Sequence, residues 1–401
     1  MPERPDIVLF STADWATRYW TNKQHVAANL AESGHRVLYV ETPGIRRPSL
    51  ASRRDIGRLA ARLKSGVRNL VSGPRQVRAN LWVLSPAVIP WGRDHGAVRG
   101  LNRAMVRSSL VRFLKKAGFR SPEVWAYHPF VRDILDGIQI GTLSYHCVDD
   151  IAAIPGVDVA RYEEEETEIL KASDVVFVTA PPLAAKARKL NGNVHLVPNV
   201  VDPAHFATAM APGPLPDDLA RIPGPRLGFH GTLSAYKIDT DLLLGLAERR
   251  PNWQIILIGD EPPAQPGHHF AALRRMANVH FLGGKDYGDL PSYLRGMDVG
   301  LLPMRLNRYT ASMYPMKYHE YLAGGVPVAS TGLAFLQGGA TFLEAGDGVE
   351  GFAVAVERQL RRGRLSAHEA AAAVGDNTWK RRQETMLEIN AQTPARRGVA
   401  S

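Results

Sequence analysis

The chain contains very little cysteine, with one in 401 residues, and this excludes an intramolecular disulfide bond. Cys147 lies in an apolar stretch, so we expect a buried thiol in a reducing compartment rather than a nucleophile. The 13 histidines show no spacing typical of a zinc site. The sequence therefore predicts no bound metal ion.

Long apolar runs are also missing. Charged residues or prolines interrupt every run before it reaches the roughly 18–20 residues that a membrane-spanning helix needs. Residues 1–15 contain acids and prolines, whereas a signal peptide has a basic segment followed by an apolar core. We expect a cytoplasmic protein.

Acidic residues are scarce in one segment, residues 46–78. Ten Arg or Lys residues accompany Asp55 alone, which gives this segment a charge of +9 out of the total of +10. Apolar residues recur at helical spacing between Ile56 and Val71. Such a helix can bind an anionic membrane surface as a peripheral anchor, or it can pack on its own domain with solvated arginines. Aromatic residues do not interleave with the basic ones, so nucleic acid is not an expected partner.

Short β-rich runs alternate with helical patterns along the whole chain, which predicts an α/β fold with parallel sheets covered on both faces. In the first half we expect helices at 21–33, 101–117, 161–172 and 182–190, and strands at 6–10, 36–41, 123–127, 141–146, 174–179 and 194–197. In the second half we expect helices at 240–250, 269–276, 290–296 and 315–323, and strands at 226–230, 253–258, 279–282, 299–302 and 326–330.

The prolines between residues 206 and 225 indicate a linker, so the sequence predicts two doubly wound, Rossmann-like domains that face a cleft. The predicted segments are a domain at 1–205, the linker at 206–225, a second domain at 226–365, a helix at 366–390 that returns toward the first domain, and a flexible tail at 391–401. Ligands of open parallel sheets bind beyond the carboxyl ends of the strands. Functional residues are therefore expected directly after strands.

One such segment surrounds the helix expected at 315–323. Ser312 can cap this helix with Pro315 in its first turn, which leaves free N–H groups and a positive helix end for an anion such as a diphosphate. Lys317 can add a positive charge. Glu320 lies on the same face as Lys317, and its carboxylate can accept hydrogen bonds from the two hydroxyls of a ribose. The alternative is an ordinary surface Lys–Glu pair.

Several motifs together resemble the GT-B glycosyltransferases, in the branch that includes bacterial teichuronic-acid, capsule and exopolysaccharide transferases. The resemblance spans most of the chain, and each motif alone is weak. The motifs are STADW at 11–15, Gln24, AESGHRVLYVE at 31–41, YHCVDD at 145–150, EEEE at 163–166, DVVFVTAPP at 174–182, VPNVVDPAHF at 197–206, GFHG at 228–231, LIG at 257–259, LPSYL at 290–294 and KYHEYLAGGVP at 317–327.

The resemblance implies that the C-terminal domain binds a nucleotide-sugar co-substrate, with uridine as the favoured base, and that no further cofactor or metal is needed. Glu320 matches the glutamate that holds the ribose, and Lys317 matches a position near the diphosphate. Eight residues before Glu320, many retaining relatives carry a second glutamate near the donor sugar. Ser312 stands there, and this leaves a retaining or an inverting reaction open. Met313 follows it in the same candidate donor segment.

Other donor-binding candidates follow the strands of the C-terminal half. Gly231 and Thr232 resemble a turn that lets the backbone approach the phosphates. Tyr287 lies in GGKDY at 283–287, which resembles the segment beside the nucleobase, and it is a stacking residue or a core residue. Arg305 can bind a phosphate through its guanidinium group.

The N-terminal half offers candidate catalytic and acceptor-binding residues. His128 follows an expected strand and resembles a histidine that contacts the donor sugar in some relatives; otherwise it is a loop histidine. Either Asp149 or Asp150 can take the acceptor proton in an inverting reaction, although one of them can instead be a helix cap or part of a salt bridge. The acceptor-binding candidates in the first loop are Asp14, Trp15 and Arg18, and Trp15 can equally belong to the core.

These observations predict a metal-independent glycosyltransferase that uses a nucleotide sugar to extend a glycan or lipid-linked glycan acceptor in bacterial cell-surface polysaccharide synthesis. Two alternatives remain at this point. One is a sugar-nucleotide epimerase of the same fold, and the other is a non-catalytic nucleotide-sugar-binding scaffold of a polysaccharide assembly complex.

Overall fold

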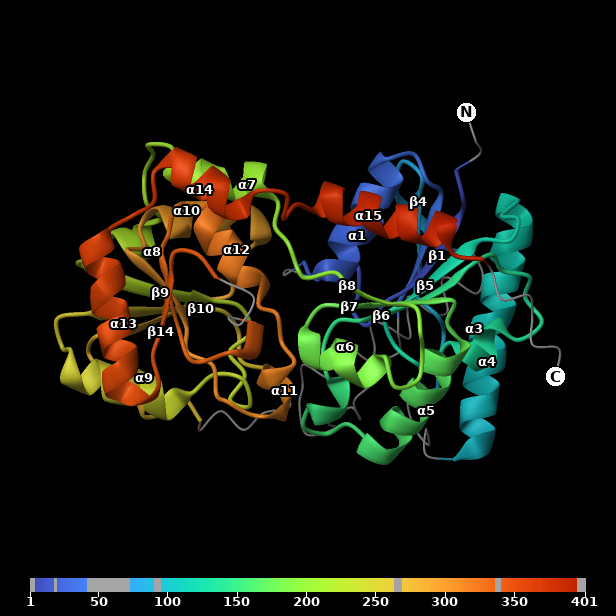
Figure 1. Ribbon diagram of the computed structural model, residues 1–401, viewed down its shortest axis with the longest axis horizontal. Helices are drawn as coiled ribbons and strands as arrows, with labels where there is room; N and C mark the ends of the chain where they lie inside the picture. The colour runs from blue at the N-terminus through green and yellow to red at the C-terminus, as the bar shows by residue number, and fades with distance from the viewer. Residues whose placement is uncertain are drawn as a thin grey trace. The chain divides into compact units, whose positions relative to one another are not determined.

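The computed structural model describes residues 4–17, 20–41, 73–89, 95–262, 269–335 and 340–394. The chain divides into two compact units (Figure 1). Unit 1 contains residues Met1–Val197 and Gln383–Ser401, and unit 2 contains Pro198–Arg382. Each unit is built on one sheet, so the predicted α/β fold with two doubly wound domains is confirmed.

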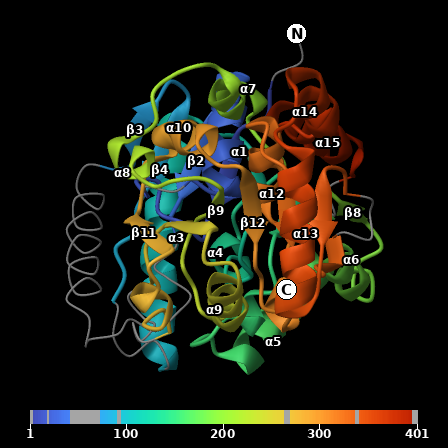
Figure 2. The same ribbon diagram turned by 90° about the vertical axis from the view of Figure 1, so that its left-hand side faces the viewer.

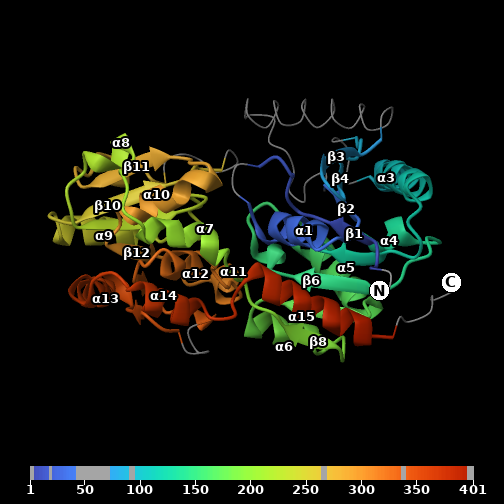
Figure 3. The same cartoon turned by 90° about the horizontal axis from the view of Figure 1, so that it is seen from above.

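Unit 1 contains an eight-stranded sheet in the order β3-β4-β2-β1-β5-β6-β7-β8, and most of its strands can be followed one beside another in Figure 3. Among the strands that the structure describes in unit 1, only β3 runs antiparallel to its neighbour. The order reverses between β1 and β5, which is where a doubly wound sheet opens a crevice. The strands are β1 (Ile7–Phe10), β2 (Val37–Val40), β3 (Arg75–Arg78), β4 (Leu81–Leu84), β5 (Glu123–Ala126), β6 (Leu143–Cys147), β7 (Val175–Val178) and β8 (Val194–Leu196).

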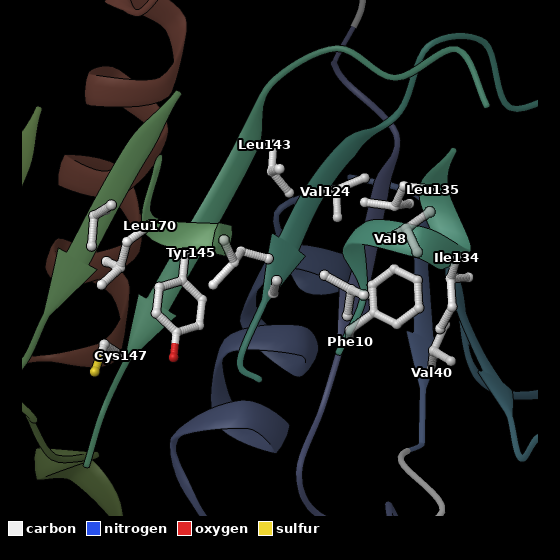
Figure 4. Packing of buried hydrophobic residues seen from close by; sticks show 14 of the residues in the cluster. Val8, Phe10, Val40, Val124, Ile134, Leu135, Leu143, Tyr145, Cys147 and Leu170 are labelled. Carbon is white, nitrogen blue, oxygen red and sulfur yellow. The ribbon is translucent and has the colours of Figure 1, made fainter. Parts of the chain in front are cut away.

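Strands β1, β2 and β7 are buried on both faces, which is why their sequences are continuously apolar. Successive side chains of a strand point to opposite faces. Val8 and Phe10 lie in the cluster that Figure 4 shows, together with side chains from α3, α4, α5 and α6. These helices are α3 (Gly96–Ala117), α4 (Arg132–Leu135), α5 (Val159–Ala172) and α6 (Pro181–Ala187).

Two further helices belong to unit 1. In α1 (Asn22–Glu32), Thr21 and Gln24 form a reciprocal capping box that fixes the start of the helix. In α15 (Trp379–Gln392), the part from Gln383 onward belongs to unit 1. There Gln383 donates a hydrogen bond to Ser33 Oγ, and Asn390 bonds Glu123 and Ser144. The C-terminal helix is thus tied to the starts of β5 and β6.

Unit 2 contains a six-stranded parallel sheet in the order β11-β10-β9-β12-β13-β14. This order reverses between β9 and β12, as in dinucleotide-binding sheets. The strands are β9 (Arg226–His230), β10 (Gln254–Ile258), β11 (Val279–Gly283), β12 (Val299–Leu302), β13 (Val328–Ser330) and β14 (Leu343–Ala345).

The helices of unit 2 include α9 (Thr240–Arg249) and α13 (Gly348–Arg362), which pack together, and α12 (Met316–Ala323), which packs on β12 and β13 (Figure 2). The shorter helices are α7 (Pro203–Ala207), α8 (Asp217–Ala220), α10 (Leu290–Arg295), α11 (Arg308–Ala311) and α14 (Ala367–Val374). None of the helices in the described ranges is both long and apolar enough to cross a membrane.

A tyrosine is inserted between two strands where the sheet of unit 2 reverses its order. Strand β12 pairs with β9 at only two positions, Val299 with Leu227 and Gly300 with Gly228. The buried Tyr321 hydroxyl donates a hydrogen bond to the carbonyl of Gly228 (3.0 Å) and accepts one from the N–H of His230 (3.3 Å). The hydroxyl therefore satisfies backbone groups of β9 that the sheet leaves unpaired.

The expected elements differ from the structure in several places. Residues 269–276 were expected to form a helix, but they form only a 3₁₀ turn at Leu273–Arg275. The prediction of one helix at 366–390 is wrong, because Gly375 (φ +48°) ends α14 and a separate helix, α15, follows. Strands β3, β4 and β14 and helix α13 were not predicted. Most of the basic segment 46–78 lies outside the described residues.

The segment expected as a linker, residues 206–225, contains α8 and lies inside unit 2. The guanidinium of Arg295 donates hydrogen bonds to the carbonyls of Thr208, Ala211 and Pro214, and Leu219 is fully buried. A side chain from α10 thus holds a proline-rich stretch that composition alone assigns to a linker. The structure divides the chain after Val197 instead.

The packing of Tyr321 on Gly300 predicts a stability effect. A Cβ atom at position 300 would lie 2.6 Å from Cγ of the Tyr321 ring, which is too close for any real contact. We expect Gly300→Ala to lower the free energy of unfolding by about 1–3 kcal/mol, measured by urea denaturation.

The control for this prediction is Gly100→Ala in the second turn of α3, where no atom beyond the adjoining helix backbone lies within 4 Å of the added Cβ. Alanine should raise the free energy of unfolding there by about 0.5–1 kcal/mol, because it is the better helix former. Equal stability of Gly300→Ala and the wild type would contradict the described packing.

Candidate functional site

Two glycines bring the loops after β9 and β10 together at the carboxyl edge of the sheet in unit 2. Gly231 (φ +128°) donates its N–H to the carbonyl of Ile258, and a Cβ on Gly259 (φ +154°) would lie 1.8 Å from the carbonyl oxygen of Gly231. Only glycine fits at position 259, because backbone fills the space that any side chain needs. The predicted glycine turn at position 231 is therefore present.

Lys317 reaches this turn from the first turn of α12. A Cβ on Gly231 would lie 2.7 Å from the Lys317 ammonium nitrogen, and the same nitrogen lies 5.7 Å from the centre of the Phe229 ring. The positive charge is therefore held at the end of β9. Helix α12 begins beside it, and its first turn closes with a hydrogen bond from Tyr318 N–H to the carbonyl of Pro315. A helix start and an ammonium group together favour an anion.

Glu320 lies one turn further along α12 and is buried, with 7% of its surface exposed. Burial raises the pKa of its carboxyl group to about 7, although the Lys317 charge acts in the opposite direction. Its Oε2 atom lies 3.5 Å from Nε2 of His230. Lys317, Glu320 and the Gly231 turn thus lie close together. The sequence predicted that Lys317 and Glu320 share one face of a helix, and it did not predict the His230 contact.

His230 is the last residue of β9 and is also buried. Burial, with a smaller contribution from Lys317, lowers its pKa well below the usual value, so the imidazole is neutral at neutral pH. The contact with Glu320 is therefore not a salt bridge. The sequence signal was the histidine in GFHG, directly before the glycine turn.

Tyr287, the candidate nucleobase contact, stacks on another ring of unit 2. Its ring lies 4.3 Å from that of His205 with an angle of 14° between the planes, and His205 Nε2 bonds the carbonyl of Tyr287. Burial is the main cause that raises the pKa of Tyr287, and the negative charge of Glu320 adds to it. One face of the tyrosine is therefore covered by histidine, so a base would have to stack on the other face.

The remaining donor candidates lie in different surroundings. Arg305 faces the acids at the start of α9, with 3.5 Å to Asp241 and 3.9 Å to Asp239. The prediction that Ser312 caps α12 is wrong, because Pro315 occupies the N-cap and Ser312 ends α11. Ser312 and Met313 are buried, and Thr232 is exposed.

In unit 1, His128 follows β5 and is buried at 4% exposure. Burial lowers the pKa of its ring to about 3, so this histidine is neutral and does not accept a proton near neutral pH. It packs near Phe10 and Phe130, with ring centres 6.3 and 6.2 Å away. These are the contacts of a packed residue, and they lie next to β1 and β5, between which the strand order reverses.

Asp149 and Asp150 follow β6 and differ in burial. Asp150 is buried and its carbonyl accepts a hydrogen bond from Ala153, while Asp149 is half-buried and its carbonyl accepts one from Ile151. Asp150 precedes the 3₁₀ turn Ile151–Ala153, but its side chain makes no capping hydrogen bond. The helix-cap alternative is therefore not supported for Asp150.

Of the acceptor candidates, Trp15 is packed as a core residue. It is 9% exposed, its ring lies 5.3 Å from that of Tyr39, and its backbone N–H donates to Glu41. Asp14 is half-buried in the same loop, and its carbonyl accepts a hydrogen bond from Gln24. Arg18 lies outside the described residues.

A buried polar cluster beside Asp150 was not predicted. Glu166 of α5, 2% exposed, accepts hydrogen bonds from Tyr145 (2.9 Å) and from the Cys147 thiol (3.6 Å), and it pairs with Lys186 at 2.5 Å. Burial raises the pKa of the Cys147 thiol, so the cysteine is an inert donor, as expected. Within the described ranges, no group of three or more His, Cys, Asp or Glu residues is placed to hold a metal ion.

Comparison with known proteins identifies the class of unit 2. Residues 224–362 match the family of group 1 glycosyltransferases, and this range contains β9 to β14, Lys317 and Glu320. No curated protein matches the chain by sequence.

Solved structures match nearly the whole chain. Sucrose-phosphate synthase from Thermosynechococcus elongatus has a TM-score of 0.64 at 16% identity and covers 97% of both chains. HepE of Anabaena, in complex with UDP and glucose, has a TM-score of 0.63 at 13% identity, with 97% of this chain and all of the other covered. WaaG, a glycosyltransferase of lipopolysaccharide biosynthesis, has a TM-score of 0.56 at 13% identity and covers 95% of both.

At these identities the structural likeness shows the fold, which is GT-B. Together with the family match in unit 2, it confirms that the chain is a glycosyltransferase enzyme. The structural matches include sucrose-phosphate and trehalose-phosphate synthases. The narrower resemblance to teichuronic-acid, capsule and exopolysaccharide transferases therefore stays a prediction.

The Glu166 cluster leads to a testable prediction. Removal of one partner of a buried ion pair leaves the other partner and its hydrogen-bond donors unsatisfied. Because Lys186 is partly exposed and can regain water, we expect Glu166→Ala to cost about 2–3 kcal/mol of the free energy of unfolding, toward the lower end for such pairs. Urea denaturation measures this loss.

Glu164→Ala is the control, because Glu164 lies on the same helix and is exposed. Its removal should change the free energy of unfolding by less than about 0.5 kcal/mol. If both variants lose the same amount, the buried pair has no special role in the stability of unit 1.

Proposed function

We propose that this enzyme transfers a sugar from a nucleoside-diphosphate sugar, with uridine as the favoured base, to a glycan or lipid-linked glycan acceptor in bacterial cell-surface polysaccharide synthesis. The observation that carries the donor half of this proposal is the group formed by Lys317, Glu320 and the Gly231 turn. It combines a positive charge, a buried carboxylate and an approachable backbone at the carboxyl edge of one sheet.

Each part of the group fits one part of such a donor. The Lys317 ammonium and the N-terminus of α12 suit the diphosphate, and the backbone at Gly231 lets an oxygen approach closely. The Glu320 carboxylate suits the two ribose hydroxyls, since each oxygen of an ionised carboxylate can accept two hydrogen bonds. The same group 1 family match covers all of these residues, and HepE was solved with UDP and glucose.

The proposed chemistry is the departure of the nucleoside diphosphate from the anomeric carbon while an acceptor hydroxyl attacks. Lys317 and the α12 helix end stabilise the charge that develops on the leaving diphosphate. In an inverting reaction, Asp149 or Asp150 takes the hydroxyl proton, while in a retaining reaction the leaving phosphate does so. His128 is neutral, so its proposed part is a contact with the donor sugar and not a proton transfer.

The acceptor and the cellular context rest on the motif resemblance. The matched structures include both a sucrose-phosphate synthase and a lipopolysaccharide glycosyltransferase, so the fold alone is compatible with different acceptors. A lipid-linked acceptor would be met at the inner face of the membrane. A peripheral position there agrees with the basic segment 46–78, which remains a proposed anchor.

The donor proposal is tested by thermal-shift measurements with nucleoside diphosphates and nucleotide sugars. A ligand at 100 times its Kd should stabilise the wild type by about 2.7 kcal/mol. Lys317→Ala and Glu320→Ala should lose most of this stabilisation, because each removes a contact with a different part of the nucleotide.

The matched control is the Lys171 and Glu168 pair on α5, which has the same spacing of three residues but is exposed. Lys171→Ala and Glu168→Ala should respond to the ligand as the wild type does. No response of the wild type to any nucleotide would refute the donor proposal. Release of the diphosphate only when a glycan acceptor is present distinguishes a transferase from an epimerase and from a scaffold without catalytic activity.

The membrane proposal predicts that the full chain sediments with vesicles containing anionic lipid and not with neutral vesicles at moderate salt. Arg58→Gln together with Arg62→Gln should weaken this binding, since each basic residue near an anionic surface contributes about 1 kcal/mol. Equal sedimentation with both kinds of vesicle would exclude an electrostatic anchor.

A further inference from the structure

The buried contact between His230 and Glu320 is not explained by the donor-binding roles assigned so far. His230 Nε2 is buried and makes no hydrogen bond with any group in the described part of the chain. Its distance of 3.5 Å from Glu320 Oε2 is beyond the usual length of such a bond. A buried ring nitrogen without a partner is costly and needs a reason.

The rest of the His230 residue is firmly held. Its backbone N–H donates to the Tyr321 hydroxyl, and its ring lies 5.0 Å from the Tyr321 ring in a perpendicular arrangement. The imidazole therefore cannot turn away from Glu320 without disturbing the position of Tyr321. This holds Nε2 facing the carboxylate.

We propose that His230 is a positioning residue of the nucleotide site, whose Nε2–H holds one oxygen of the ionised Glu320 carboxylate so that the other oxygen accepts the ribose hydroxyls. This inference rests on the proposed function and deepens it, because it assigns a role to a residue that contacts Glu320 and not the nucleotide.

In this proposal, one proton lies between the Glu320 carboxyl group and Nε2 of His230, and either residue can carry it. When Glu320 is ionised, His230 carries its proton on Nε2 and donates it to the carboxylate. When Glu320 is protonated, its O–H donates to Nε2, and the imidazole carries its own proton on Nδ1. The ring stays neutral in both states, so the histidine changes tautomer without changing charge.

The proposal also makes nucleotide binding depend on pH. The groups that face the pair are Lys317 on α12, Tyr321 on the same helix, and Tyr287 from the loop after β11. Burial raises the pKa of both tyrosines, so they stay neutral near pH 7, and the carboxyl group of Glu320 has its pKa in this range. Its pKa of about 7 means that the binding-competent carboxylate forms as the pH rises through 7.

The first test measures the Kd of nucleotide sugars by calorimetry between pH 6 and pH 8. Their diphosphate has no group that titrates in this range, so a pH effect belongs to the protein. The wild type should bind about tenfold more tightly at pH 8 than at pH 6, because the ionised fraction of Glu320 rises by that factor. Glu320→Gln should remove this pH dependence.

The variants at position 230 separate positioning from packing. His230→Phe keeps a ring but has no hydrogen-bond donor, so we expect about tenfold weaker nucleotide binding at pH 8. The midpoint of the pH dependence of the Kd should also shift to higher pH. His230→Gln keeps an N–H near the position of Nε2 and should restore most of the loss. His280→Phe on β11, a half-buried histidine that contacts Gln254, is the matched control and should bind like the wild type.

A second measurement needs no nucleotide. Nitrogen-15 NMR of the histidine rings should show that the proton of His230 moves from Nδ1 to Nε2 as the pH rises from 6 to 8, with the resonance assigned from its loss in His230→Gln. The Glu320→Gln variant should show no such change.

The outcomes separate this inference from the proposed function. A tautomer that does not change with pH, or His230→Phe that binds like the wild type at every pH, overturns the role of His230 even if nucleotides bind. A wild type that binds no nucleotide sugar overturns the proposed function and the ribose contact, while the tautomer measurement by itself decides whether His230 and Glu320 share a proton.

Discussion

The position of the Tyr321 hydroxyl between β9 and β12 is the constraint on which the candidate donor site depends. It replaces hydrogen bonds that a continuous sheet would make, and it requires glycine at position 300, where the tyrosine ring lies. Because Tyr321 is fixed to the sheet, its neighbour Glu320 and the preceding turn with Lys317 must face the end of β9. Tyr321 thus determines which side of α12 faces the sheet, and with it where the side chains of Lys317 and Glu320 lie.

The sequence predicted the parts of this arrangement that depend on local pattern. Strands β9 and β12 were located to the residue, because buried parallel strands are continuously apolar and are bounded by turn residues. The three-residue spacing of Lys317 and Glu320 also places them on one face of any helix. Helix α13 was not predicted, because glycines at positions 348 and 351 interrupt the helical spacing of its apolar residues.

Features that arise from tertiary packing could not be predicted in the same way. The residues next to His230 and Glu166 in the sequence do not indicate that these side chains are buried, because distant segments of the chain cover them. Ser312 is a good cap in isolation, but the short helix α11 ends on it and leaves Pro315 to start α12. The two units also differ, because Trp15 and His128 of unit 1 are packed residues, whereas Lys317, Glu320 and Gly231 of unit 2 lie together at the end of β9.

Helix α15 has a consequence for anyone who wishes to study the two units separately. Its first turn belongs to unit 2, where Arg382 donates to the carbonyl of Pro198, and the remainder bonds Ser33, Glu123 and Ser144 of unit 1. A gene fragment that stops at residue 197 would encode a protein whose β5 and β6 lack the segment that completes them. Recombinant unit 1 would need residues 383–394 rejoined by an artificial connection, and unit 2 would have to end inside a helix.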